Sequence, residues 1–234
     1  MQCEEEKARI LSKHRSNIVA VTNQSLPVYT EPSKEAIAKL RSLITRHENF
    51  PKSGIVFRDF FPLLLKPSDF SVLVDAFASH VISEHKCFLA DGGPIVDAVV
   101  GLDARGFLIG PQLAARLNCA FIPVRKAGKL PGETIEFSFS KEYGDDVFAV
   151  QKNRWEQVVK ADGTTRPMRI IIVDDVLATG GTLRAAIELV NQTGAIPLEC
   201  LCVLDIAELD GKNVVERSCN VPVWTLFTFT DNDM

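Results

Sequence analysis

Residues 168 to 182 combine two carboxylates with a glycine-rich loop, a pairing suited to binding a sugar phosphate. The stretch reads Met-Arg-Ile-Ile-Ile-Val-Asp-Asp-Val-Leu-Ala-Thr-Gly-Gly-Thr. In the loop from Ala178 to Thr182, two glycines allow close approach of the backbone to an anion, and two threonines offer hydroxyl donors. A helix that begins at the end of this loop adds free N–H groups and the positive end of its dipole. The loop is therefore predicted to hold a phosphate.

Asp174 and Asp175 precede the loop and would by themselves repel a phosphate. Ionised carboxylates accept hydrogen bonds strongly from hydroxyl groups, so the pair suits a ligand that carries hydroxyls next to its phosphate. A ribose 5-phosphate meets both demands. The loop is neither a Walker loop, since it lacks the Gly-Lys-Ser/Thr sequence, nor a G-x-G-x-x-G dinucleotide motif.

The elements that must position these residues alternate between strands and helices. Ile170 to Val173 is a β-branched run typical of a strand buried on both faces, and a helix is expected from Leu183 to Thr193. Further strands are expected at Ala98 to Leu102, Ala120 to Val124, Leu198 to Asp205 and Val223 to Phe229, and further helices after Ser33, after Ser68 and at Leu108 to Leu117. This alternation predicts an α/β fold with a mostly parallel sheet, whose ligands lie beyond the carboxyl ends of the strands.

Charged residues follow two other predicted strands and should reach the same sheet edge. Asp103-Ala104-Arg105 follows one of them, and the basic segment 125–132 follows the next. A hairpin of Thr134 to Ser140 with Val147 to Gln151 comes after it and is expected to form a mobile lid. Spacing alone makes the segment 50–59 a loop packed on the core, with Arg58 and Asp59 as a surface pair.

Composition limits the class of protein. The chain has 234 residues, 46% of them hydrophobic and 24% charged, which is typical of a globular protein with ample material for a core. A net charge of −4 argues against a nucleic-acid surface. The six cysteines form no C-x-x-C pair and indicate reduced thiols in a cytoplasmic protein, with Cys200 and Cys202 buried on one face of a strand. No apolar run reaches membrane-spanning length, and residues 1–13 lack the features of a signal peptide.

The segment Ile171 to Thr182 resembles the phosphoribosyl-pyrophosphate (PRPP) motif of type I phosphoribosyltransferases. More narrowly, the chain resembles the adenine phosphoribosyltransferases. The resemblance rests also on Phe50 to Asp59 with Phe61-Pro62, Gly101 to Pro111, Arg125-Lys126 with Gly128 to Gly132, Glu142-Tyr143-Gly144 and Leu198-Glu199-Cys200, in that family's order. It implies a single phosphoribosyltransferase domain at 32–234 after an N-terminal extension at 1–31. The domain would carry a small base-binding hood at about 48–62 and a β-hairpin lid at about 125–151.

The resemblance also implies a reaction, in which adenine and PRPP give AMP and pyrophosphate. Mg²⁺ would be carried by PRPP with no direct protein ligand, and the enzyme would be a homodimer that binds neither nucleic acid nor membrane. The implied PRPP contacts are Asp103, Ala104, Arg105, Lys126, Lys129, Tyr143, Asp174, Asp175, Ala178, Thr179, Gly180, Gly181 and Thr182. The implied adenine contacts are Val56, Phe57, Arg58, Val176 and Glu142.

The same resemblance assigns individual roles. Phe57 and Val176 would enclose the purine, and the backbone of Val56 and Arg58 would select its 6-amino group. Glu142 and Arg105 are the implied catalytic residues, with Glu142 exchanging a proton with purine N7. Asp103-Ala104 is expected to be a non-proline cis peptide.

Two departures from the family pattern and two alternatives stand beside this interpretation. Ala127 occupies a position where many relatives carry a basic residue, and the segment Asn153 to Arg166 is longer than in short family members. A 6-oxopurine phosphoribosyltransferase would carry a base-selecting lysine and an aromatic segment after Leu204, which the sequence lacks. A non-catalytic PRPP-sensing regulator would normally carry a nucleic-acid-binding segment, and the acidic balance speaks against one.

Overall fold

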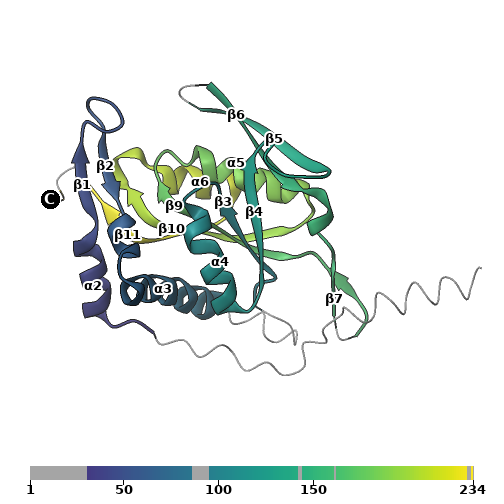
Figure 1. Cartoon of the computed structure of the whole chain (residues 1–234). Helices are drawn as coiled ribbons and strands as arrows, with labels where there is room; N and C mark the ends of the chain where they lie inside the picture. Colours follow the sequence, from purple (N-terminus) through teal and green to yellow (C-terminus); the bar gives the residue numbers. More distant parts are fainter. Residues whose placement is uncertain (1–30, 86–94, 142–143, 161, 231–232, 234) are drawn as a thin grey trace, which may run out of the picture.

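The computed structural model describes residues 31–85, 95–141, 144–160, 162–230 and 233, and its centre is a seven-stranded sheet with the order β11-β10-β9-β3-β4-β6-β5 (Figure 1). Of the predicted extension at 1–31, residues 1–30 lie outside these residues. The strands of this sheet are β3 (Ala98–Leu102), β4 (Ala120–Lys126), β5 (Thr134–Lys141), β6 (Gly144–Gln151), β9 (Arg169–Leu177), β10 (Ile196–Ile206) and β11 (Val223–Phe229). The pairs from β11 to β4 are parallel, whereas β6 and β5 are antiparallel. The predicted α/β class is confirmed.

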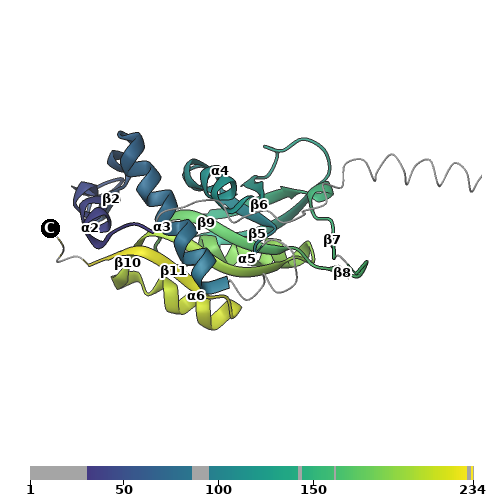
Figure 2. The ribbon, with the colours of Figure 1, turned by 90° about the horizontal axis from the view of Figure 1, so that it is seen from below.

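Helices cover both faces of the sheet, and alternation along β9 divides the core between them. Ile171 and Val173 face the cluster formed with α2 (Lys34–Leu43), α3 (Pro67–His85) and α4 (Gly106–Leu117). Ile170 and Ile172 face the cluster formed with α5 (Gly181–Gln192) and α6 (Gly211–Cys219). Figure 2 shows the two helix groups on opposite sides of β9 and β10. Because all four side chains are fully buried, β9 is fixed on both faces, and the loop that follows it has a rigid support.

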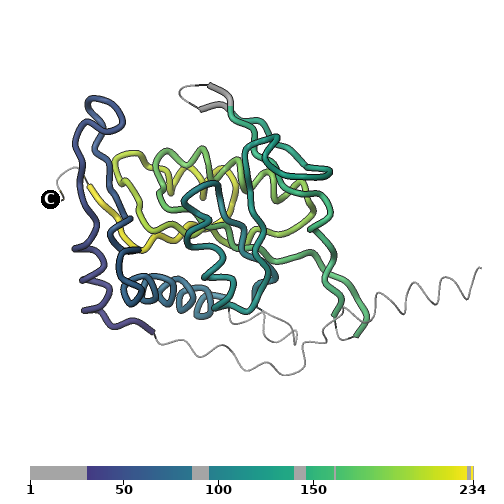
Figure 3. The backbone as a smooth tube through the Cα atoms, viewed as in Figure 1, coloured from purple at the N-terminus to yellow at the C-terminus, as the bar shows by residue number. Residues whose placement is uncertain are grey.

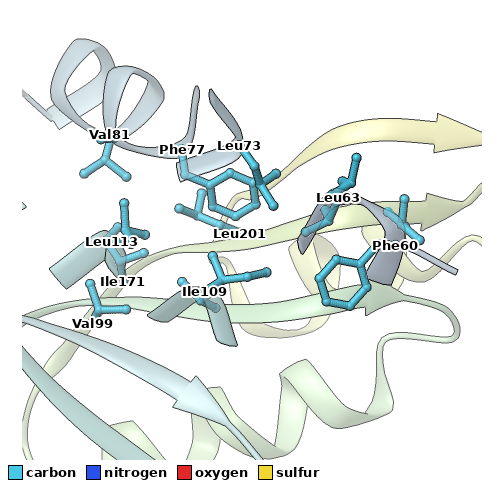
Figure 4. Packing of buried hydrophobic residues seen from close by; sticks show 14 of the residues in the cluster. Phe60, Leu63, Leu73, Phe77, Val81, Val99, Ile109, Leu113, Ile171 and Leu201 are labelled. Atoms are coloured by element: carbon cyan, nitrogen blue, oxygen red, sulfur yellow. The ribbon is translucent and has the colours of Figure 1, made fainter. Parts of the chain in front are cut away.

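The first of these clusters is large and apolar. Figure 4 shows side chains of α3 and α4 packed against the strands. It labels Phe60, Leu63, Leu73, Phe77, Val81, Val99, Ile109, Leu113, Ile171 and Leu201. The second cluster contains Cys200 and Cys202. Both thiols are buried and free, which confirms the prediction for these cysteines.

The predicted helices are present, with some shifted boundaries. Ser33 caps α2 as expected, since its hydroxyl accepts a hydrogen bond from the N–H of Ala36. The expectation that Ser68 caps the next helix is wrong, because α3 begins one residue earlier at Pro67, where the missing N–H costs nothing. The helix α6, which begins after Asp210, was not among the predicted elements.

Two hairpins extend on the same side of the molecule, one near each end of the seven-stranded sheet (Figure 3). One is the predicted lid hairpin of β5 and β6. The other consists of β1 (Thr45–Glu48) and β2 (Val56–Asp59) and is followed by the short helix η1 (Phe61–Leu64). The expectation of a loop over residues 50–59 is therefore wrong for its second half, which forms a strand. Every residue of β1 is exposed, so apolar periodicity could not reveal it.

The longer segment at 153–166 is anchored to the base of the sheet. It contains the short strand pair β7 (Val158–Val159) and β8 (Thr165–Arg166), which follows the single turn η3 (Lys152–Arg154). Another single turn, η4 (Ala207–Leu209), follows β10. At the end of the segment, the guanidinium group of Arg166 pairs with the buried carboxylate of Asp97, with 2.9 Å between Nη2 and Oδ1. This pair fixes the far end of the longer segment.

Candidate active site

A pocket of about 230 Å³ lies at the carboxyl ends of β3 and β9. It brings together twelve of the predicted site residues: Asp103, Ala104, Arg105, Lys126, Asp174, Asp175, Val176, Ala178, Thr179, Gly180, Gly181 and Thr182. Phe148, Leu177 and Leu183 complete the lining and were not predicted as site residues. Phe148 lies on β6, where alternation of apolar residues marks only an inward-facing strand position and gives no signal for a ligand. The pocket lies where an open parallel sheet places its ligands.

The predicted phosphate loop connects β9 directly to α5. Gly180 has φ of +82° and precedes the first residue of the helix, so a left-handed residue redirects the chain at this point. Since glycine has no side chain to cap the helix, the first N–H groups of α5 face the pocket without a side-chain partner. The loop is also packed closely from behind, because a Cβ on Gly180 would lie 2.8 Å from the carbonyl oxygen of Gly211 in α6.

The two carboxylates lie at the end of β9 and are electrostatically strained. Asp175 is buried, and its Oδ2 lies 2.9 Å from Nη1 of Arg105. The N–H of Arg105 is not aimed at this oxygen, so among the described residues Oδ2 has an ion-pair neighbour but no hydrogen-bond donor. Burial, followed by the charge of Asp175, raises the pKa of Asp174 well above its usual value. Burial also raises the pKa of Asp175, against the lowering effect of Arg105. The pair is thus suited to accept hydroxyl donors from a ligand.

Arg105 connects the pocket to the β1–β2 hairpin. Its guanidinium carbon lies 5.5 Å from the centroid of the Phe57 ring, within the range of a cation–π contact. Val176, half-buried, reaches the pocket from β9. The predicted base-binding aromatic residue and the predicted sugar-binding carboxylate therefore share one arginine as a neighbour.

The opposite side of the pocket is basic and is held by ion pairs. The peptide bond between Asp103 and Ala104 is cis, as predicted. Arg125 pairs with Asp103 (Nε to Oδ2, 2.9 Å), and Lys126 pairs with Asp146 of β6 (Nζ to Oδ1, 3.0 Å). Arg125 and Lys126 belong to β4 and not to the loop after it, because that strand continues to pair with β6. Lys126 lines the pocket, whereas Arg125 supports Asp103 from outside it.

Some predicted residues do not line the pocket. Lys129 lies in the loop after β4, where its carbonyl oxygen accepts a hydrogen bond from Arg125, and Val56, Phe57 and Arg58 lie on β2. The expected surface pair of Arg58 and Asp59 is wrong: Arg58 is 5% exposed, and Asp59 accepts a hydrogen bond from the N–H of Phe61. Glu142 and Tyr143 lie outside the described residues.

The sequence matches those of known proteins over most of its length. Residues 76–219 match the family model of the phosphoribosyl transferase domain, a range that contains the pocket but not the β1–β2 hairpin. The chain is 43% identical to the adenine phosphoribosyltransferase of Candida albicans over 193 residues, which are 82% of this chain and 90% of the relative.

The chain belongs to the adenine phosphoribosyltransferase family.

Solved structures of adenine phosphoribosyltransferases share the fold described above. The enzyme from Saccharomyces cerevisiae, solved with an imino-altritol bisphosphate and adenine, is 40% identical and aligns with a TM-score of 0.70 over 83% of this chain and all of its own. The enzyme from Trypanosoma brucei, solved with AMP, pyrophosphate and ribose 5-phosphate, is 25% identical with a TM-score of 0.66, covering 87% of each chain. In the part of this family member that the structure describes, no helix is long and apolar enough to cross a membrane.

Proposed function

We propose that the protein transfers the phosphoribosyl group of PRPP to N9 of adenine, giving AMP and pyrophosphate, in purine salvage. The observation that carries this proposal is the juxtaposition, in one pocket, of the α5 N-terminus, the buried carboxylate pair and the cationic rim of Arg105 and Lys126. Each of these three groups matches one part of PRPP: the 5-phosphate, the ribose hydroxyls and the pyrophosphate.

The 5-phosphate binds to the loop from Ala178 to Thr182. Its oxygens accept hydrogen bonds from the uncapped N–H groups of α5 and from the hydroxyls of Thr179 and Thr182, and the helix dipole favours the negative charge. This arrangement needs no lysine in the loop, which accounts for the absence of a Walker sequence.

The ribose hydroxyls donate to Asp174 and Asp175. Oδ2 of Asp175 supports this assignment, since it is a buried acceptor without a hydrogen-bond donor among the described residues. Two carboxylates beside the sugar also favour the positive charge that develops on the ribose ring as the bond from C1 to pyrophosphate breaks. Burial raises the pKa values of the pair and so disfavours two negative charges at this place, and a sugar with developing positive charge would offset this cost.

Pyrophosphate lies against the Asp103–Arg105 loop and Lys126, and Lys129 approaches it from the adjoining loop. Mg²⁺ would be carried by PRPP with no direct protein ligand, and it would offset charge on the departing pyrophosphate. The described residues form no group of three or more His, Cys, Asp or Glu side chains arranged as a metal site. The chain's own cations, Arg105 and Lys126, hold and orient the leaving group.

Adenine lies against Phe57, with Val176 on its other face. Arg105 occupies the neighbourhood of the Phe57 ring in this structure, so base binding repositions this side chain toward the pyrophosphate. The backbone of Val56 and Arg58 on the outer edge of β2 reads the 6-amino group, since β1 pairs with the other edge of that strand. Glu142 accepts the proton from N7 of adenine as N9 attacks C1 and the bond from C1 to pyrophosphate breaks.

The protein works as a homodimer in the cytoplasm. Free thiols at Cys119, Cys200, Cys202 and Cys219 suit a reducing compartment. Large apolar side chains in the hood and just after it are exposed, among them Phe50 at 54% and Leu65 at 80%, and they offer a surface for a second copy. Light scattering coupled to size exclusion measures the assembly directly.

The deciding experiment compares adenine, hypoxanthine and guanine side by side in the presence of PRPP and Mg²⁺. Adenine should be consumed with release of pyrophosphate, and a preference for hypoxanthine would overturn the proposal. The Glu142→Leu variant should lose roughly 100-fold in turnover, the typical contribution of a positioned acid or base, with little change in substrate binding. Glu136→Leu, an exposed position on β5 of the same hairpin, is the matched control and should retain normal turnover.

A further inference from the structure

Arg58 connects the hood to the C-terminal part of the chain. It is the buried residue of β2, and its Nη2 donates to the carbonyl oxygens of Thr230, at 3.1 Å, and of Asp233. Successive side chains of a strand point to opposite faces. Phe57 therefore points toward Arg105 of the pocket, while Arg58 points toward the end of β11 and the residues after it.

A second arginine, from α2, reaches the same place. The guanidinium carbon of Arg41 lies 4.1 Å from the centroid of the Phe229 ring, and that of Arg58 lies 4.8 Å from it. Arg41 also donates to the carbonyl oxygen of Thr228 (2.9 Å) and to Oδ1 of Asp233 (3.1 Å). The ring of Phe229 thus contacts the arginines of both α2 and β2, and the carboxylate of Asp233 pairs with the arginine of α2.

The carboxylate of Asp233 is in turn fixed by its own segment. Oδ2 accepts hydrogen bonds from the backbone N–H of Thr230 (2.6 Å) and from its hydroxyl (3.0 Å). These bonds, together with Arg41, lower the pKa of Asp233, so the side chain is ionised when it meets the guanidinium group. We name the set of Phe229, Thr230 and Asp233 the C-terminal clamp.

We propose that the C-terminal clamp positions the base-binding strand and thereby sets the affinity for adenine, separately from the affinity for PRPP. The separation follows from the topology. Within the described part of the chain, β2 pairs only with the exposed strand β1, so its place against the domain depends on side-chain contacts, and Arg58 is its buried side chain. The PRPP pocket is lined by β4, β6, β9, α5 and the loop after β3, whereas the clamp lies at the end of β11, the edge strand of the same sheet.

This inference rests on the proposed function, in which β2 contacts the base. The residues of the C-terminal clamp are positioning residues, since their side chains act on the site through Arg58 and the backbone of β2. A loosened clamp should let β2 shift against the purine while the phosphate loop and the carboxylates keep their places.

The test measures KM for each substrate and the equilibrium Kd for adenine in Arg41→Ala, Asp233→Ala and Phe229→Leu. Each variant should raise KM and Kd for adenine by about ten-fold, the typical effect of losing a charge-assisted contact, with KM for PRPP changed less than about two-fold. Phe229→Tyr keeps the ring and should restore adenine binding. Lys34→Ala, an exposed position on α2, is the matched control.

Three results would overturn the inference: equal shifts in both KM values, no shift in either, or no recovery with Phe229→Tyr. Because Arg41 and Asp233 share an ion pair, the double variant should lose less than the sum of the two single losses, whereas fully additive losses would contradict a shared clamp. The wild-type protein tests the proposed function separately. If it used another base, the proposed substrate would be wrong, and the clamp would then be judged on the KM for the base that it does use.

Discussion

A Cβ on Gly211 would lie 2.0 Å from the carbonyl oxygen of Ala178, so the start of α6 and the proposed phosphate loop are in contact that leaves no room for a side chain. The Gly211→Ala substitution must push the loop or the helix aside. We expect KM for PRPP to rise about ten-fold or more, with KM for adenine nearly unchanged. Arg217→Ala, exposed on the same helix, is the control. Normal PRPP kinetics in Gly211→Ala would show that the loop tolerates displacement.

The ionised carboxylate of Asp174 is expected to reduce the stability of the folded protein. Burial and the charge of Asp175 raise its pKa, so the folded state favours the protonated form, and this contribution is lost as pH rises through the folded pKa. Asp174→Asn should therefore raise Tm at neutral pH by roughly 3 °C, equivalent to about 1 kcal/mol, while weakening PRPP binding. The gain should shrink as the pH is lowered toward the usual pKa of 3.8.

The matched control for this substitution is Asp162→Asn, because the pKa of the exposed Asp162 is lowered by hydrogen bonds from Thr164. Calorimetry across pH should show no stabilisation for this variant. Equal gains in Tm for the two substitutions would mean that the carboxylate pair at the site is not strained.

Glu199 lies at the opposite end of the sheet, in a buried cluster with two histidines. Its Oε1 lies 2.8 Å from Nε2 of His80, and its Oε2 lies 3.0 Å from Nε2 of His85. Burial alone would raise the pKa of Glu199, but these hydrogen bonds and charges outweigh it and lower the pKa below 4.5. The resulting stability is present above the unfolded pKa and is lost as pH falls through the folded pKa.

Glu199→Gln should consequently reduce the free energy of unfolding by about 2 kcal/mol at pH 7, the usual worth of hydrogen bonds to a charged group. The stability curves of the two proteins should converge below pH 4.5. Chemical denaturation at several pH values measures this, with the exposed Glu188→Gln of α5 as control. A constant difference at all pH values would rule out the ionised carboxylate as its source.

Arg125 supports the proposed pyrophosphate subsite from outside the pocket. Its Nε lies 2.9 Å from Oδ2 of Asp103, and its Nη1 donates to the carbonyl oxygen of Lys129 at 3.3 Å. The Arg125→Leu variant should loosen both loops, so KM for PRPP and the inhibition constant of pyrophosphate should rise together, by roughly ten-fold. Arg154→Leu provides an exposed control of the same chemistry. A rise in KM for adenine alone would place the effect of Arg125 elsewhere.

Much of the pocket could be predicted because its signals are local. A β-branched run, two acids and a glycine loop occupy consecutive positions, and β9 with its loop forms as this pattern requires. The hood could be predicted only in part. β1 has no buried residue to mark it, and the burial of Arg58 depends on a segment 172 residues further along the chain. The role of Gly211 could not be predicted either, since a glycine in a polar stretch gives no sign of the loop against which it packs.

The strand order has a consequence for how the ligand relates to the fold. From the neighbouring strands β3 and β9 the chain proceeds in opposite directions, through α4 to β4 and through α5 to β10. The helices that follow these two strands therefore cover opposite faces, and the pocket is lined by Arg105, the N-cap of α4, and by the first residues of α5. A PRPP molecule bound at both of its phosphate ends would connect the elements on the two faces of the sheet. Substrate occupancy and resistance to unfolding would then rise together.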